Sequence, residues 1–248
     1  MNEEKEQQYD VILSFTSWKG RIYDRKFLYV LQHALEQTTT YKYKLVLALS
    51  DEEFPKKESE LPKDIVFIAE SMPDRFEIIW THKNTKALKK LNPAMHKWPE
   101  LPIITFDDDE ILSKNAVERM MCEHKKTPEC IIGADCHSLK RRNCTYDKIK
   151  LVTHVRLFPA HSLEDLSEEI FSSVFNNLED DIFNGIRSAI KGTKSRRIGI
   201  SGLTVDGQWF PVLYDNKTNL GREYRRADAL AMVREFVAKY PQYEKQCI

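Results

Sequence analysis

Short apolar segments alternate with amphipathic segments along the first half of this 248-residue sequence. The apolar segments DVILSF (10–15), YKLVLALS (43–50) and IITF (103–106) are typical of buried strands. Between the first two, the segment 25–37 repeats apolar side chains at helical spacing behind Asp24, a residue type that favours a helix start. Alternating strands and helices form a mostly parallel sheet covered on both faces. The sequence therefore predicts an α/β, Rossmann-like fold.

Further elements are expected along the rest of the chain, and the second half is less regular. Strand-like segments are DIVFIAE (64–70), RFEIIWTH (75–82), ECIIGADC (129–136) and KIKLVTHVRLF (148–158). Helical spacing occurs at 85–98, where Pro93 kinks or divides the segment, at 114–124, in two pieces over 162–192, and at 226–240. The segment 197–214 is typical of a strand, a turn at Asp206-Gly207 and a second strand.

Composition excludes several classes of protein. The 38 basic and 38 acidic residues cancel, so there is no global basic field of the kind that binds nucleic acid. No run of about 18 apolar residues occurs and the first residues lack an apolar signal segment, which predicts a cytoplasmic protein without a membrane span and leaves peripheral membrane contact open. Four of the five cysteines have spacings of eight, six and eight residues. These spacings lack the pairs of a zinc site and indicate reduced thiols.

Three aspartates follow the strand-like segment 103–106 directly, in the stretch LPIITFDDDEIL (101–112). In doubly wound sheets, ligands bind at the carboxyl ends of the strands, where these acids are expected to lie. Asp107 and Asp109, separated by one residue, can point to the same side and bind a divalent cation such as Mn²⁺ or Mg²⁺ through oxygen. Such a site leaves positions for a nucleotide diphosphate. The alternative is a helix entry, where acids favour the positive end of the helix dipole.

The residues around these acids resemble the GT-A-fold glycosyltransferases that use nucleotide sugars, above all small bacterial family 2-like members with a D-x-D motif. The resemblance runs from about residue 10 to residue 192 and rests on VILSFTSWKGRI (11–22), KKLNPAM (89–95), ITFDDDEI (104–111) and EDDIF (179–183). It implies a single GT-A-like domain, with a nucleotide-sugar-binding half at about 10–125 and an acceptor-side half at about 126–248.

The resemblance also implies an activity and a set of residues. A hexosyl group would pass from a nucleotide diphosphate sugar to a hydroxyl acceptor, such as a bacterial surface glycan, with inversion and with a divalent metal. The residues that the family pattern implies are Thr16, Ser17 and Arg21 for the base and ribose, Asp51 for a second nucleotide contact, Lys86, Lys89 or Lys90 for the diphosphate, Asp107 and Asp109 for the metal, and Asp108 near the ribose. Since Lys89 and Lys90 are adjacent, at most one is expected to face the ligand. A solvated helix face is the other interpretation of the lysines.

Transfer to a hydroxyl also requires a base that removes the acceptor proton. In inverting relatives the aspartate of an ED pair opening a helix resembles that base, and Asp180 fits this position, with Asp181 as its rival. Both are also ordinary acids for a helix start. His154 or His161 could complete the metal shell, although a lone histidine is more often structural.

Two other functions share these features. A sugar nucleotidyltransferase would need the same sheet, metal and nucleotide, but it normally has a glycine-rich loop after the first strand, and TSWKGR (16–21) contains only Gly20. A non-catalytic nucleotide-sugar-binding module would use the acids only as a helix entry. Metal-dependent binding of nucleotides separates the enzymes from an inert module.

Overall fold

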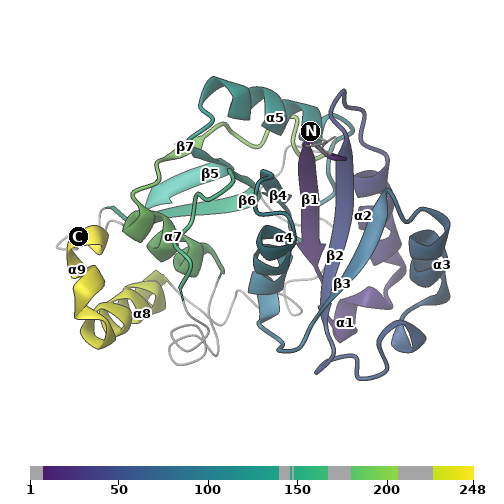
Figure 1. The fold of residues 1–248 in the computed structure, drawn as a ribbon, viewed down its shortest axis with the longest axis horizontal. Helices are drawn as coiled ribbons and strands as arrows, with labels where there is room; N and C mark the ends of the chain where they lie inside the picture. The colour runs from purple at the N-terminus through teal and green to yellow at the C-terminus, as the bar shows by residue number, and fades with distance from the viewer. Residues whose placement is uncertain (1–7, 140–145, 147, 167–179, 206–225) are drawn as a thin grey trace, which may run out of the picture.

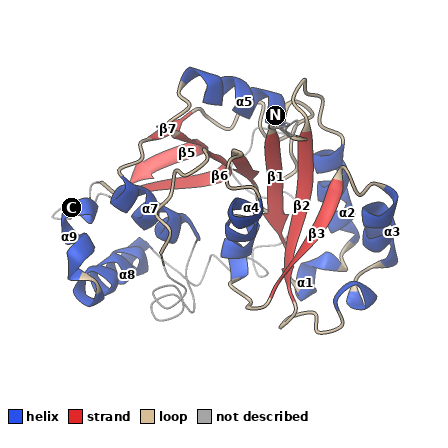
Figure 2. Ribbon diagram, viewed as in Figure 1, coloured by secondary structure: helices blue, strands red, loops and turns tan. Residues whose placement is uncertain are grey.

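The computed structural model describes residues 8–139, 146, 148–166, 180–205 and 226–248. Within them a seven-stranded sheet has the order β3-β2-β1-β4-β6-β5-β7 (Figures 1 and 2). The strands are β1 (Val11–Thr16), β2 (Tyr43–Ser50), β3 (Phe76–Thr81), β4 (Ile103–Thr105), β5 (Ile131–Ser138), β6 (Lys150–Phe158) and β7 (Ser195–Arg197). Neighbouring strands pair in parallel, except that β6 runs antiparallel to both β4 and β5. The predicted α/β, mostly parallel architecture is confirmed.

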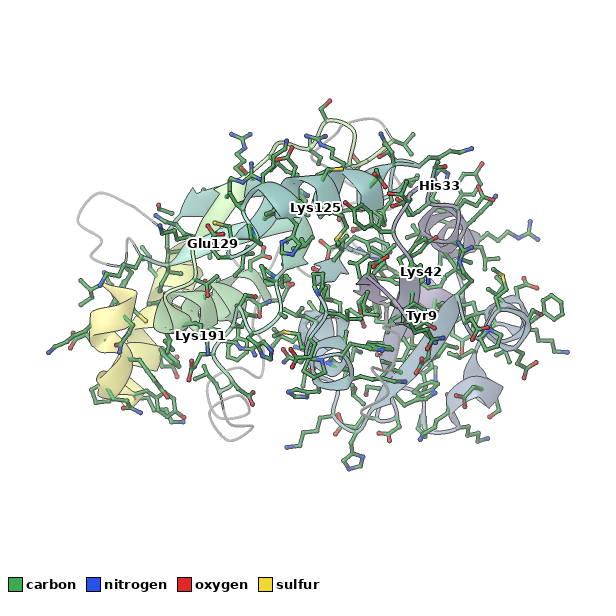
Figure 3. All side chains as sticks on the ribbon, turned by 45° about the horizontal axis from the view of Figure 1, so that its top comes forward. Tyr9, His33, Lys42, Lys125, Glu129 and Lys191 are labelled. Atoms are coloured by element: carbon green, nitrogen blue, oxygen red, sulfur yellow. The ribbon has the colours of Figure 1, made fainter. Side chains whose placement is uncertain are left out.

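Helices cover both faces of this sheet. They are α1 (Lys19–Ile22), α2 (Arg25–Leu35), α3 (Lys63–Ser71), α4 (Asn92–Lys97), α5 (Ala116–Lys126), α7 (Asp180–Lys191), α8 (Arg226–Lys239) and α9 (Glu244–Cys247), with the 3₁₀ turns η1 (Lys57–Glu60), η2 (Lys86–Lys90) and η4 (Pro241–Tyr243). One apolar cluster joins the sheet to α2, α3 and α5, and a second joins the opposite face to α4. In a third cluster α7, which ends at Lys191 (labelled in Figure 3), packs with α8, α9 and the start of β6.

The end of β1 is held level with the end of β4 by aromatic packing. Along β1, Val11, Leu13 and Phe15 face the first cluster, whereas Ile12 faces the opposite one, as the two-residue period of a strand requires. The ring of Phe15 stacks on that of Phe106, with centroids 4.8 Å apart. The loops that follow these two strands therefore begin side by side.

The segment 64–70 is a helix and not the predicted strand. Its apolar side chains at Ile65, Ile68 and Ala69 follow helical spacing and pack against the first apolar cluster, and Pro62 stands at the helix start. Phe67 points away from the protein and is 68% exposed. A short run of apolar residues does not show whether its period is that of a strand or of a helix. Here the segment forms a helix, because only one of its faces has a core to pack against.

The predicted strand–turn–strand at 197–214 is only partly described, and the described part corrects it. β7 ends at Arg197, and the following residues form isolated bridges and turns, with Gly199 and Gly202 at φ +82° and +72°. These left-handed backbone conformations interrupt an extended strand. The turn at Asp206-Gly207 and the expected second strand lie outside the described residues. Of the helix pieces expected over 162–192, the later one is α7, and residues 167–179 lie outside the described part.

Helix α2 begins as the sequence predicts, at a capping aspartate. A carboxylate oxygen of Asp24 accepts a hydrogen bond from the backbone N–H of Lys26 at 2.9 Å. We expect Asp24→Ala to lower the free energy of unfolding by about 1 kcal/mol, because an N–H of the first turn loses its acceptor. Urea unfolding measures the change, and Asp24→Asn, which keeps a capping oxygen, should retain most of the stability.

Among the described residues, no helix is both long and apolar enough to cross a membrane.

Candidate functional site

Polar side chains from the loop after β1 meet the aspartates that follow β4. The Ser17 hydroxyl donates to the carboxylate of Asp108 at 2.6 Å, and the Arg21 guanidinium forms ion pairs with Asp108 and, at 3.1 Å, with Asp109. All four side chains are buried. Thr16 instead donates to the Ala48 carbonyl on β2 at 2.6 Å. Two of the three residues predicted in the first loop therefore contact the motif directly.

Lys90 connects the same motif to the start of α7. Its ammonium group contacts the Asp107 carboxylate and lies 2.9 Å from Oδ2 of Asp180. Its side chain is only 3% exposed. Burial and the nearby Arg156 would lower the pKa of Lys90, but the carboxylates of Asp107 and Asp180 raise it above its ordinary value. Lys90 is therefore held charged between two segments 73 positions apart in the sequence, since they lie at 107 and 180.

Arg156 is the site residue that the sequence reasoning missed. It pairs across the sheet with Thr105, and its guanidinium contacts Asp181, lies 2.7 Å from Asp180 and reaches within 3.7 Å of Asp107. The side chain is 1% exposed. A signal was present, because an arginine inside the apolar run VRLF needs a buried acid partner.

The acids of this site differ in how well their charge is compensated. Although partial desolvation opposes the change, Lys90 and Arg156 lower the pKa of Asp107 to about 2. Burial and the charge of Asp107 raise the pKa of Asp109 to about 7, which Arg21 only partly offsets. Burial also raises the pKa of Asp181 to about 7 against the attraction of Arg156. Asp109 and Asp181 thus have pKa values near 7, far above that of Asp107, and burial raises the pKa of Asp108 as well.

The other predicted lysines and Asp51 have different surroundings. Lys89 is buried and points to the carboxylate of Glu53 at 3.3 Å and to the side chain of Asn84 at 2.8 Å. Lys86 is exposed. Asp51, at the end of β2, lies 3.4 Å from His82. The adjacent Lys90, described above, contacts the motif through Asp107.

His154 adjoins the motif through Glu110, whereas His161 is paired with the exposed Glu100. The imidazole Nδ1 of His154 lies 2.9 Å from Glu110, whose other carboxylate oxygen accepts the backbone N–H of Asp107. Burial would lower the pKa of His154, but Glu110 raises it. His154 also has φ +63°, a left-handed conformation that is costly for a residue with a Cβ.

The donor set of the site fits a hard divalent cation that is shared with a phosphate ligand. Across the described residues, no three His, Cys, Asp or Glu side chains are grouped to hold an ion by themselves. Asp107, with a side chain 41% exposed, and Asp109, with an under-compensated charge, nevertheless offer carboxylate oxygens on one loop. Mg²⁺ is commonly held by one or two carboxylates plus substrate phosphates. These two residues would hold such a cation.

Comparison with known proteins identifies the fold. No protein-family model matches the sequence, and no curated protein matches it. Among solved structures, the mannosyltransferase PcManGT from Pyrobaculum calidifontis, in complex with GDP-Man and Mn²⁺, matches with a TM-score of 0.52 and 13% identity over 96% of this chain and 76% of that chain. The fold is of the GT-A type.

Two other structures match this GT-A fold less well. TarS from S. aureus has a TM-score of 0.48 and 9% identity, over 92% of this chain and 42% of that chain. A 4-diphosphocytidyl-2C-methyl-D-erythritol synthase has a TM-score of 0.47 and 10% identity, over 89% and 99%. At these identities, the roles of individual residues in the GT-A fold of this chain must come from its own site.

Proposed function

We propose that this protein is a glycosyltransferase that moves a sugar from a nucleotide diphosphate sugar to a hydroxyl acceptor, with inversion and with a divalent cation. The observation that carries the proposal is the convergence of four parts of the chain, at 17–21, 90, 107–109 and 180–181, through ion pairs and hydrogen bonds among mostly buried side chains. Donor-binding and proton-accepting groups are thereby held within one cluster. The GT-A fold supports the same function.

The donor would bind where the loops after β1 and β4 meet. Ser17, Arg21 and Asp108 form the buried wall proposed to hold the nucleoside, and the partly exposed Asp107 lies next to Asp109 for the cation. When bound, the cation would offset the negative charge that develops on the departing diphosphate. Lys90, which shares Asp107, keeps the charge of this acid balanced in the absence of ligand.

The two acids at the start of α7 are unequal candidates for the base. Asp180 is 11% exposed, and its Oδ2 lies within 3 Å of both Lys90 and Arg156, so this oxygen is already shared by two cations. Asp181 contacts Arg156, is 24% exposed and has its pKa raised to about 7. A base is most effective when its pKa is close to the operating pH. We therefore assign the base to Asp181, and to Asp180 the role of holding Lys90 and Arg156.

The loop after β1 argues against a nucleotidyltransferase. A phosphate-cradling loop needs glycines that let the backbone approach the ligand. Here a Cβ built on Gly20 would lie 2.2 Å from the Trp18 ring, so the space over this glycine is filled by the protein's own indole. The loop instead presents the Ser17 and Arg21 side chains to Asp108.

A screen of donor hydrolysis tests the proposed function without an acceptor. The protein is incubated with common nucleotide diphosphate sugars and Mn²⁺ or Mg²⁺, and released nucleotide diphosphate is measured, with calorimetry of nucleotide binding alongside. We expect slow, metal-dependent hydrolysis of one donor class, and inverted anomeric configuration by NMR once an acceptor is found. Binding without hydrolysis or transfer would indicate a binding module, and pyrophosphate release from nucleoside triphosphate and sugar phosphate would indicate a nucleotidyltransferase.

Asp109→Asn is expected to remove the metal dependence of nucleotide binding. The substitution keeps the volume of the side chain but removes one of the two proposed cation-binding charges, so nucleotide affinity with Mn²⁺ should fall to its value in EDTA. Calorimetry with and without Mn²⁺ measures this change. Asp74→Asn, at an exposed aspartate, is the matched control and should bind as the wild type. If Asp109→Asn kept the full Mn²⁺ dependence, the cation would lie elsewhere.

A further inference from the structure

Arg156, on β6, joins the acids of the motif to the acids of α7. Strand β6 runs antiparallel to β4, and the register places Arg156 opposite Thr105, two residues before Asp107. From there one guanidinium contacts Asp181 and Asp180 through Nη1 and approaches Asp107 through Nη2. Three carboxylates from two distant segments therefore share this one cation.

The burial of Arg156 limits what it can do. Its side chain is 1% exposed, and its Nε is buried without a hydrogen-bond partner among the described residues. A substrate at the exposed edges of Asp107 and Asp181 would meet those carboxylates and not the guanidinium behind them. Arg156 can therefore affect the reaction only through the acids it holds.

We propose that Arg156 is a positioning residue of the transfer reaction, which fixes the orientation of Asp181 and, together with Lys90, ties this base to the donor-binding acid Asp107. This role rests on the proposed function and extends it to a residue on β6, which neither the aspartate motif nor α7 by itself would indicate. Two shared cations thereby connect the donor site to the base. Lys90 contacts both Asp107 and Asp180, and Arg156 contacts both of these acids and Asp181.

The geometry requires an arginine and not merely a positive charge. A guanidinium is a planar fork whose several N–H donors can serve separate carboxylates at fixed angles, whereas an ammonium is a compact point charge on a flexible stem. Lys90 already supplies such a point charge to Asp107 and Asp180. Arg156→Lys should therefore keep the net charge of the site and lose the orientation of Asp181.

The substitution should also change how the reaction depends on pH. The charged and titratable groups around Asp181 are Arg156 and His154 on β6, Lys90 on η2, Asp180 on α7 and Asp107 after β4. Of these, Arg156 lies in direct contact and favours the ionised carboxylate. When the contact weakens, the pKa of Asp181 rises, and the acid limb of the rate profile moves to higher pH.

The experiment compares wild type with Arg156→Lys and with a control variant, Arg196→Lys. Arg196 forms an ion pair with Glu123, at 2.8 Å, and takes no part in the cluster around Asp181. We measure kcat and donor KM for transfer or donor hydrolysis between pH 5 and 9, nucleotide binding by calorimetry, and folded fraction by circular dichroism. For Arg156→Lys we expect at least about a 10-fold lower kcat with little change in donor KM, and an acid limb about one pH unit or more higher. Arg196→Lys should keep the wild-type profile.

The outcomes separate the positioning role from a structural one. A lower kcat with an unshifted acid limb, or a loss that tracks the folded fraction, would overturn the proposal. If Arg156→Lys does not fold, Arg156→Ala is assayed with guanidinium ion added at millimolar concentration. Restored kcat supports the proposal, and failure of both variants to fold assigns Arg156 to the structure alone. If the wild-type protein itself processes no donor, the proposed function fails, and this result differs from a failure of the Arg156 proposal, in which the wild type is active.

Discussion

Asp181→Asn is expected to lower the rate of sugar transfer by about 100-fold or more while nucleotide affinity stays within a few-fold of wild type. The amide keeps the size of the side chain and a contact to Arg156, but it cannot accept the proton of the acceptor hydroxyl. Donor binding depends on the loops after β1 and β4, which Asp181 does not contact in the described interactions. Transfer assays at saturating donor, together with calorimetry, measure the two quantities separately.

The neighbouring acid is the matched comparison for this variant. Asp180→Asn removes the carboxylate that Lys90 and Arg156 share, so we expect lower stability and a smaller loss of transfer than in Asp181→Asn. If instead Asp180→Asn abolished transfer and Asp181→Asn retained it, the base would be Asp180.

The pH profile of the wild type provides an independent check of this assignment. A base acts in its unprotonated form, so the transfer rate should rise as pH increases through about 7, the value to which burial raises the pKa of Asp181, and then level off. Asp181→Asn should lose this limb from any residual activity. A wild-type profile that is flat between pH 5 and 8 would contradict the role of Asp181.

The sequence predicts the strands β1 to β6, but it also predicts a strand at 64–70, where the structure has a helix, and it does not predict β7. β1 and β2 are mostly apolar and are bounded by polar turns, the pattern expected of a strand covered on both faces. The segment 64–70 resembles a strand in the sequence because its run of apolar residues hides the helical period, which the structure reveals by placing Ile65 and Ala69 against one cluster. Short runs of this kind are decided by tertiary packing.

The candidate site was predictable where several polar residues follow a strand, and not where a single charge lies inside one. Ser17, Arg21 and the aspartates stand after strand-like segments, and the parallel sheet brings such ends together. Arg156 lies within a strand, and only the pairing of β6 with β4 reveals that it faces the acids. Lys89 and Lys90 lie at the end of a 3₁₀ turn and are both buried, and only the tertiary structure shows that Lys90 contacts Asp107 whereas Lys89 contacts Glu53.

Lys90→Met is expected to lower the free energy of unfolding by about 3–5 kcal/mol at pH 7, because it leaves Asp107 and Asp180 with less compensation in a buried site. The folded-state pKa of Lys90 lies above its ordinary value, so its contribution is fully present below about pH 10 and is lost only as pH rises through the folded-state pKa. Asp107 has the opposite sign: its pKa of about 2 means that its contribution is present above about pH 4 and is lost as pH falls toward 2. Wild type should exceed Lys90→Met in stability throughout the range between these limits.

Lys89→Met is the decisive comparison, because the two lysines are adjacent and equally buried, each 2% exposed, but their pKa values move in opposite directions. Burial lowers the pKa of Lys89, and Glu53, its acid partner at 3.3 Å, only partly offsets this effect. Folding therefore destabilises the charged form of Lys89 relative to the unfolded chain, and replacement by an apolar side chain of similar length should cost about 1 kcal/mol or less. Urea unfolding of both variants at pH 7 measures the difference. Equal losses would mean that burial of the lysine stem dominates, and that Lys90 does not hold α7 to the aspartate motif by its charge.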